Sequence, residues 1–158
     1  MTAESPPSAP SAALLPPGVA LDRAALRLGY AGLLPFVLCA ALVWIVRADA
    51  RPHVATALSS YAAVIVSLLG GIHWGLGFRN ARAEPARFAW GVVPALRAWV
   101  AVMMPAHAAL VVHGVALIGC YLVDRRVYPR HGIAHWLTLR FRLTAIGSMS
   151  CFFGAAGS

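Results

Sequence analysis

The stretch that decides the fold is residues 54–78, which reads VATALSSYAAVIVSLLGGIHWGLGF and contains no Asp, Glu, Lys or Arg. A helix rises about 1.5 Å per residue, so this run is long enough to cross the ~30 Å hydrocarbon core of a bilayer. The rest of the chain suits the same solvent. Of its 158 residues, 60% are hydrophobic and only 11% are charged, whereas soluble domains carry about 25% charged residues. We therefore expect a membrane protein.

Four further apolar runs predict, with this one, an all-α polytopic protein of five transmembrane helices. The spans are expected at about 28–46, 54–78, 88–104, 106–123 and 143–157. The third and fourth runs are parted by a turn at Pro105 and should form a helical hairpin. The fifth run is short, so the helix is expected to extend into the residues that precede it, with its arginines reaching to the headgroups.

Proline residues mark two further features of the chain. Pro35 and Pro94 should kink the first and third spans, because proline lacks the amide donor of a regular helix. Residues 1–20 are rich in Pro, Ser and Ala and predict a disordered cytoplasmic tail. Residues 21–158 then form the transmembrane domain.

All 13 basic residues are arginines, and the net charge is +8. Ten of them flank the five spans on one side and two on the other, while Arg97 lies within the third span. The positive-inside rule places the N-terminus in the cytoplasm and the C-terminus outside the inner membrane. Arginines beside apolar runs favour anionic lipid headgroups over nucleic acid. The predicted headgroup contacts are Arg125, Arg126, Arg140 and Arg142.

These two pairs of arginines lie at the two ends of a loop of about 20 residues, 124–142. The loop also contains Tyr128, His131, His135 and Trp136. Aromatic residues among arginines are typical of the membrane–water interface. We interpret this loop as an interfacial segment, and a docking surface for a partner is the alternative.

Small residues recur every four positions in the second span, and these are Ala63, Ser67, Gly71 and Gly75. On a helix they form one stripe, where another backbone can approach closely. Packing against another helix of the same chain is the favoured interpretation, and homodimerisation is the alternative.

His73 lies in the same span, close to its cytoplasmic end. Its imidazole either forms a hydrogen bond to a neighbouring helix or interfacial water, or acts as a ligand or proton carrier. The adjacent Trp74 is most simply an interfacial anchor.

Arg97 is expected in the middle of the third span, where an arginine costs about 2.5–3.5 kcal/mol on insertion scales. No carboxylate is expected at its depth. Its guanidinium could donate to the Trp90 carbonyl, which Pro94 leaves without a helical partner. The alternative is that Arg97 faces a polar cavity or binds an anion.

His113 falls at a similar depth on the fourth span. A haem held by His73 and His113 is not expected, because the two residues differ by roughly 7 Å in depth and axial ligands must be nearly level. The three cysteines have no metal-binding spacing and should pack as small apolar residues. No set of residues indicates catalysis, a cofactor or a metal.

Residues 67–75, SLLGGIHWG, resemble a signature of an uncharacterised bacterial membrane family, domain of unknown function 3429, which is related to eukaryotic transmembrane protein 69. Three further stretches are similar in kind. They are LGYAGLLPF at 28–36, WGVVPAL at 90–96, and DRR at 124–126 with LRFRLT at 139–144. The resemblance covers roughly residues 26–150 and implies five helices and no agreed activity. Arg97 departs from the apolar residue expected there.

We therefore expect an integral inner-membrane protein without catalytic activity, which acts as a structural, assembly or interaction protein. Its partners would be anionic lipids and other membrane proteins. The alternative is a small-solute or proton pathway that uses His73, Arg97 and His113.

Overall fold

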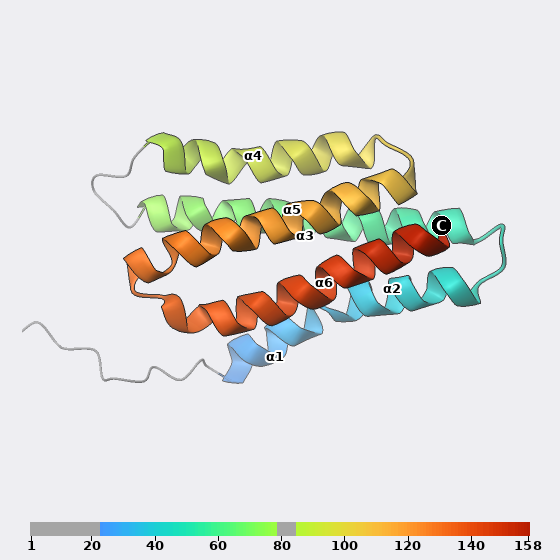
Figure 1. Cartoon of the computed structure of the whole chain (residues 1–158), viewed down its shortest axis with the longest axis horizontal. Helices are drawn as coiled ribbons and strands as arrows, with labels where there is room; N and C mark the ends of the chain where they lie inside the picture. Colours follow the sequence, from blue (N-terminus) through green and yellow to red (C-terminus); the bar gives the residue numbers. More distant parts are fainter. Residues whose placement is uncertain (1–22, 79–84) are drawn as a thin grey trace, which may run out of the picture.

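Helices joined by short turns make up most of the described part of the computed structural model, which comprises residues 23–78 and 85–158 except for the side chain of Arg87. The predicted tail, 1–20, lies outside these residues. The all-α class is confirmed (Figure 1). The helices are α1 (Arg23–Ala31), α2 (Leu34–Ile45), α3 (Arg51–Phe78), α4 (Pro85–Val102), α5 (Ala106–Val127), the 3-10 helices η1 (Pro129–His131) and η2 (Ala134–Trp136), and α6 (Leu137–Gly157).

The first predicted span is a broken helix, α1 followed by α2. The break falls at Gly32 and Leu33, and Pro35 lies in the first turn of α2, where its missing amide costs no helical hydrogen bond. Tyr61 of α3 steadies the break, since its hydroxyl donates to the Gly32 carbonyl oxygen over 2.8 Å. The kink predicted for Pro35 is therefore present. In contrast, α4 is assigned as one helix through Pro94.

Three of the helical segments in the described residues are long and apolar enough to cross a membrane, namely Arg23–Ile45, α3 and α5. The apolar part of α4, Phe88–Val102, is shorter. The fifth predicted span starts earlier than its apolar run, because α6 begins at Leu137 and is 21 residues long.

The predicted 20-residue loop at 124–142 is wrong in its extent. Asp124 lies within α5 and Arg140 within α6, and the connection between the helices covers only residues 128–136. Gly132 reverses the chain there with a φ of 71°, a left-handed conformation that glycine adopts readily. The short turn brings the end of α5 beside the start of α6.

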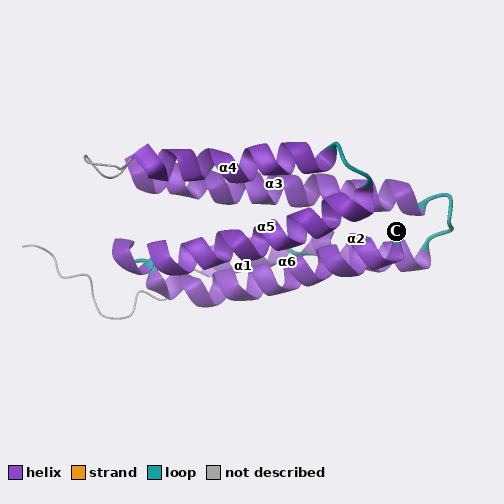
Figure 2. Cartoon of the chain, turned by 45° about the horizontal axis from the view of Figure 1, so that its top comes forward, coloured by secondary structure: helices purple, strands orange, loops and turns teal. Residues whose placement is uncertain are grey.

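The α3 helix lies at the centre of the bundle and contacts α2, α4, α5 and α6. The α1–α2 segment packs on α3 and α6 at one side, and α4 packs mainly on α3 and much less on α5 at the other (Figures 1 and 2). We call the end of the bundle that contains η1 and η2 the η end, and the other the C-terminal end. Buried core residues come from all of the long helices, for example Phe36, Leu58, Val66 and Leu110.

Two glycines set the close approach of α3 and α4. A Cβ atom built on Gly70 would overlap the backbone carbonyl of Gly91, and one built on Gly91 would overlap the ring of Trp74. The predicted glycines are not the ones used: Gly71 and Gly75 are exposed, and a Cβ on either would meet no atom within 4 Å. The prediction of internal packing at these two positions is therefore wrong, because the helix turns the adjacent glycine inward. Ala63, in contrast, packs against the core.

Candidate functional site: a buried His–Asp–Arg network

A hydrogen-bonded network of three ionisable side chains joins α3, α5 and α6. The Nε2 atom of His73 lies 3.0 Å from Oδ1 of Asp124, and Arg140 donates from Nε to Oδ2 over 2.9 Å and also from Nη2. His73, Asp124 and Arg140 are 2%, 1% and 9% exposed. A charge this deeply buried is tolerated only when it is paired and hydrogen-bonded, and here both carboxylate oxygens have partners.

Each member of the network comes from a buried helix face. Asp124 continues a stripe along α5 that includes Leu110, His113, Leu117 and Cys120, at spacings of three and four residues. Arg140 lies one turn before the buried Thr144 on α6. The turn through Gly132 lets these two faces meet, and the parallel course of α3 beside α5 brings His73 level with Asp124.

The charges within the network balance when His73 is neutral, because Arg140 is cationic and Asp124 anionic. Tyr128, which follows α5, extends the cluster toward the η end and is 3% exposed. Burial, and then the charge of Asp124, raise the pKa of Tyr128 to about 12. The phenol therefore stays protonated as a hydrogen-bonding group at neutral pH.

Two predictions change at this site. Arg140 was expected to reach lipid headgroups, but it is buried and paired with Asp124 instead. Asp124 was assigned to an interfacial loop and was missed as a site residue. Of the two possibilities for His73, the hydrogen bond to a neighbouring helix is present, and a proton-carrying role stays a prediction.

Trp74 packs α3 against α4 at the η end. Its indole Nε1 donates to the carbonyl oxygen of Phe88 over 2.9 Å, and its ring meets Phe78 and Phe88 edge-on. It is 38% exposed, so an interfacial role stays a prediction.

His113 lies in the centre of the bundle and has no partner among the described residues. It is 0% exposed, and neither ring nitrogen forms a hydrogen bond. It lies 11 residues before Asp124 on α5, so it is about 16 Å along the axis from the level of His73. This separation is larger than the sequence indicated and is too great for two axial ligands of one haem. No group of His, Cys, Asp or Glu that could hold a metal occurs among the described residues.

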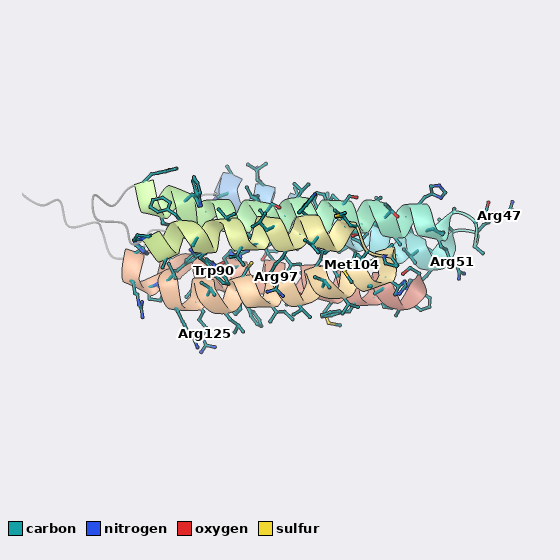
Figure 3. All side chains as sticks on the ribbon, turned by 90° about the horizontal axis from the view of Figure 1, so that it is seen from above. Arg47, Arg51, Trp90, Arg97, Met104 and Arg125 are labelled. Atoms are coloured by element: carbon teal, nitrogen blue, oxygen red, sulfur yellow. The ribbon has the colours of Figure 1, made fainter. Side chains whose placement is uncertain are left out.

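Arg97 is not part of the network. It lies on the exposed side of α4 where α4 borders α5 (Figure 3), and within the described chain its guanidinium forms no hydrogen bond or ion pair. The predicted bond to the Trp90 carbonyl is therefore not formed. Beside Arg97 is a hollow of about 290 Å³, and its lining includes Leu96, Val100, Ala101, Met104 and Val112.

The other predicted headgroup arginines remain accessible. Arg125 and Arg126 are exposed in the last turn of α5, at the η end. Arg142 is also exposed, and its Nη1 donates to the Tyr30 hydroxyl over 3.3 Å. Their contact with lipid stays a prediction. The three cysteines are free: Cys120 and Cys151 are buried in the core, and Cys39 packs against it.

Apolar helices of membrane-spanning length, fastened by buried polar groups, define an all-helical membrane protein. Residues 21–156 match the family described as "Protein of unknown function (DUF3429)", and the chain belongs to this family. It is also similar to Transmembrane protein 69 of Xenopus tropicalis, with 39% identity over 138 residues that cover 81% of this chain and 52% of the relative. The chain thus spans about half the length of that curated relative. No solved structure matches it.

Proposed function

We propose that the chain is a five-span protein of the bacterial inner membrane, with the N-terminus in the cytoplasm, which binds another membrane protein and has no catalytic activity. The observation that carries the binding proposal is Arg97, a cation that has no partner among the described residues and lies on an exposed, otherwise apolar helix face. Lipid tails cannot satisfy a guanidinium, whereas a protein partner can.

The proposed orientation is supported by the charges at the two ends of the bundle. Exposed arginines gather at the η end, and these are Arg23, Arg27, Arg125, Arg126, Arg130 and Arg142. At the C-terminal end, Arg47 lies in the connection from α2 to α3 and Arg51 is the first residue of α3. The positive-inside rule favours the η end as the cytoplasmic end, where Arg125 and Arg126 would contact anionic headgroups.

The rest of the bundle supports a binding role by providing a rigid platform. The His73–Asp124–Arg140 network fixes α3, α5 and α6 relative to one another, and the Gly70–Gly91 contact fixes α4 on α3. The α4 helix lies at the edge of the bundle, so its outer face is free to contact a second protein.

Site-specific photo-crosslinking in intact membranes tests this proposal. A photoreactive residue at Val100, one turn from Arg97 and 53% exposed, should give a discrete protein adduct. Met149 of α6, which is 66% exposed, is the matched control and should give lipid adducts alone. Lipid adducts alone from Val100 would contradict the proposal.

A proton or small-solute pathway is a second candidate, and the specific observation that favours it is His113. A buried polar group without a partner costs about 1–3 kcal/mol, so internal water is expected beside the imidazole. Further buried hydroxyls that have no partner among the described residues belong to Ser59, Thr144 and Ser148. Proteoliposomes should then pass protons faster than empty vesicles, and His113→Phe should abolish the difference. Equal proton permeability of the wild-type and empty vesicles would exclude this candidate.

A further inference from the structure

We infer that the face around Arg97 binds a transmembrane helix of another protein that carries an Asp or Glu near the middle of the bilayer. This inference rests on the proposed binding function and specifies the chemistry of the partner. We define the Arg97 face as Leu96, Arg97, Val100 and Met104 of α4 with Val112 of α5, the residues around the hollow described above.

The depth of Arg97 follows from the packing of α3 and α4. The two helices are antiparallel and touch at Gly70 and Gly91. Arg97 lies six residues beyond Gly91, so it is level with Val64, six residues before Gly70. Val64 is close to the middle of α3, which spans residues 51–78. Arg97 therefore projects from α4 at a level about halfway along α3.

The surroundings of Arg97 are apolar and open. Leu96 and Val100 are 54% and 53% exposed, and Met104 is 42% exposed. Because α4 contacts α5 sparsely, a shallow hollow remains between the two helices, and its lining includes Val112. Such a hollow can accept the side-chain ridge of another helix, and a carboxylate on that ridge can bind the guanidinium through two hydrogen bonds.

Within the described residues, a second copy of this chain offers no free carboxylate at this level. The five acidic residues are Glu4, Asp22, Asp49, Glu84 and Asp124. Of these, only Asp49 and Asp124 belong to the described residues, and Asp49 lies between α2 and α3, where it pairs with Arg47. Asp124 is buried, and both of its oxygens are occupied by His73 and Arg140. The described residues therefore supply no anion opposite Arg97, and a helix of a different molecule can deliver one at the required depth.

The test uses synthetic transmembrane helices as defined probes. Three 21-residue Leu/Ala helices carry a central Glu, a central Gln, or a Glu placed near one end. Each is labelled with an acceptor dye and mixed with donor-labelled full-length protein in phosphatidylcholine vesicles. Energy transfer should show that the central-Glu helix binds at least about tenfold more tightly than the other two, because only it pairs with Arg97 away from water.

Variants of the protein separate this pair from general electrostatics. Arg97→Leu should bind all three helices equally and weakly. Arg125→Leu removes the same charge from an exposed position at the η end and should keep the full preference. A wild-type protein that binds the Glu and Gln helices equally overturns the inference, as does an Arg97→Leu variant that keeps the preference.

Two other occupants give distinct results. If a second copy covers the Arg97 face, energy transfer between donor- and acceptor-labelled copies of the protein appears in the wild type and is lost in Arg97→Leu. If an anionic lipid covers it, phosphatidylglycerol in the vesicles removes the preference for the central-Glu helix. Either result overturns the inference. The Val100 crosslink is independent of both, so the binding proposal stands if that adduct forms while the Glu preference is absent.

Discussion

Gly70 and Gly91 bring α3 and α4 into backbone contact, and Gly71, the next residue along α3, faces away from every other helix. No side chain fits at position 70, whereas any small side chain fits at position 71, one residue further along the same helix. This contrast provides a matched pair of substitutions.

Gly70→Ala should destabilise the protein, because its methyl group would overlap the backbone carbonyl of Gly91, which cannot move aside without shifting α4. Overpacking of this kind costs about 1–3 kcal/mol, or roughly 3–10 °C in melting temperature. A thiol-reactive dye that reports exposure of Cys120 and Cys151 would measure the transition in detergent. Gly71→Ala should leave the melting temperature unchanged or slightly raised, since alanine favours helix more than glycine does. Equal effects of the two substitutions would contradict the assigned contact.

Asp124→Asn should destabilise the bundle by about 3–5 kcal/mol, because it leaves the buried Arg140 cation without its counter-charge. Asp49→Asn is the matched control. Asp49 pairs with Arg47 on the surface, where both side chains are more than three-quarters exposed, and such pairs contribute about 0–1 kcal/mol. Chemical unfolding in detergent would compare the two variants. The double variant Asp124→Leu with Arg140→Leu should recover most of the lost stability, and failure to recover would show that the pair is not the cause.

The alkaline stability of the protein should depend on Tyr128. The pKa of Tyr128 is raised to about 12, above its ordinary value of 10.0, so the unfolded chain releases this proton first. The free energy of unfolding should therefore fall between about pH 10 and pH 12, and Tyr128→Phe should fall less over that window. The other tyrosines and the cysteines also titrate at alkaline pH, but they are the same in both proteins, so the difference between the wild type and Tyr128→Phe isolates Tyr128. Absorbance of tyrosinate near 295 nm should show that one of the four tyrosines ionises only near pH 12. If no tyrosine ionises at this high pH, the assignment to Tyr128 is wrong.

Insertion of α4 should improve greatly when Arg97 is replaced. The apolar part of this helix, Phe88–Val102, must compensate for a central arginine that costs about 2.5–3.5 kcal/mol. In a translocation assay on the isolated segment, Arg97→Leu should raise the insertion equilibrium by about 100-fold. Trp99→Leu, an exposed apolar substitution two residues away, is the control and should have little effect. Similar insertion of the wild-type and Arg97→Leu segments would place Arg97 at the membrane surface.

Reporter fusions test the proposed orientation. Alkaline phosphatase fused after Ser158 should be active, because the phosphatase folds only outside the cytoplasm and an odd number of spans places α6 with its end outside. The same enzyme fused after Gly132, in the turn between α5 and α6, should be inactive. The reverse pattern would mean that the bundle has the opposite orientation. Activity at both positions would mean that the number of spans differs from five.

Most of the helices could be predicted from the sequence. A membrane-spanning helix must be a long apolar segment, and such a segment can be recognised without knowing which helices it contacts. The start of α6 was harder to predict, because Arg140 and Arg142 lie in its first two turns. Their charges made this part of the helix look like a loop. The signal was still present: Arg140 and Thr144 are one turn apart on the face that becomes buried.

The network was missed for a different reason. Asp124 was treated as part of an interfacial loop because it precedes two arginines, yet its spacing from His113, Leu117 and Cys120 places it on the buried stripe of α5. Its pairing with His73 spans 51 positions and depends on which helices are neighbours. Sequence periodicity indicates the buried face of a helix but does not give the neighbour that covers it. The prediction that Gly71, rather than Gly70, packs against another helix was wrong because the neighbour of that face was unknown.

The order of the three network residues along the chain has a consequence for biogenesis. His73 and Asp124 are synthesised before Arg140, which arrives with the final helix. Until α6 docks, the bundle contains a carboxylate whose cationic partner has not yet emerged from the ribosome. The last helix therefore completes the network, and a chain that ended before α6 would leave the carboxylate of Asp124 without its cationic partner.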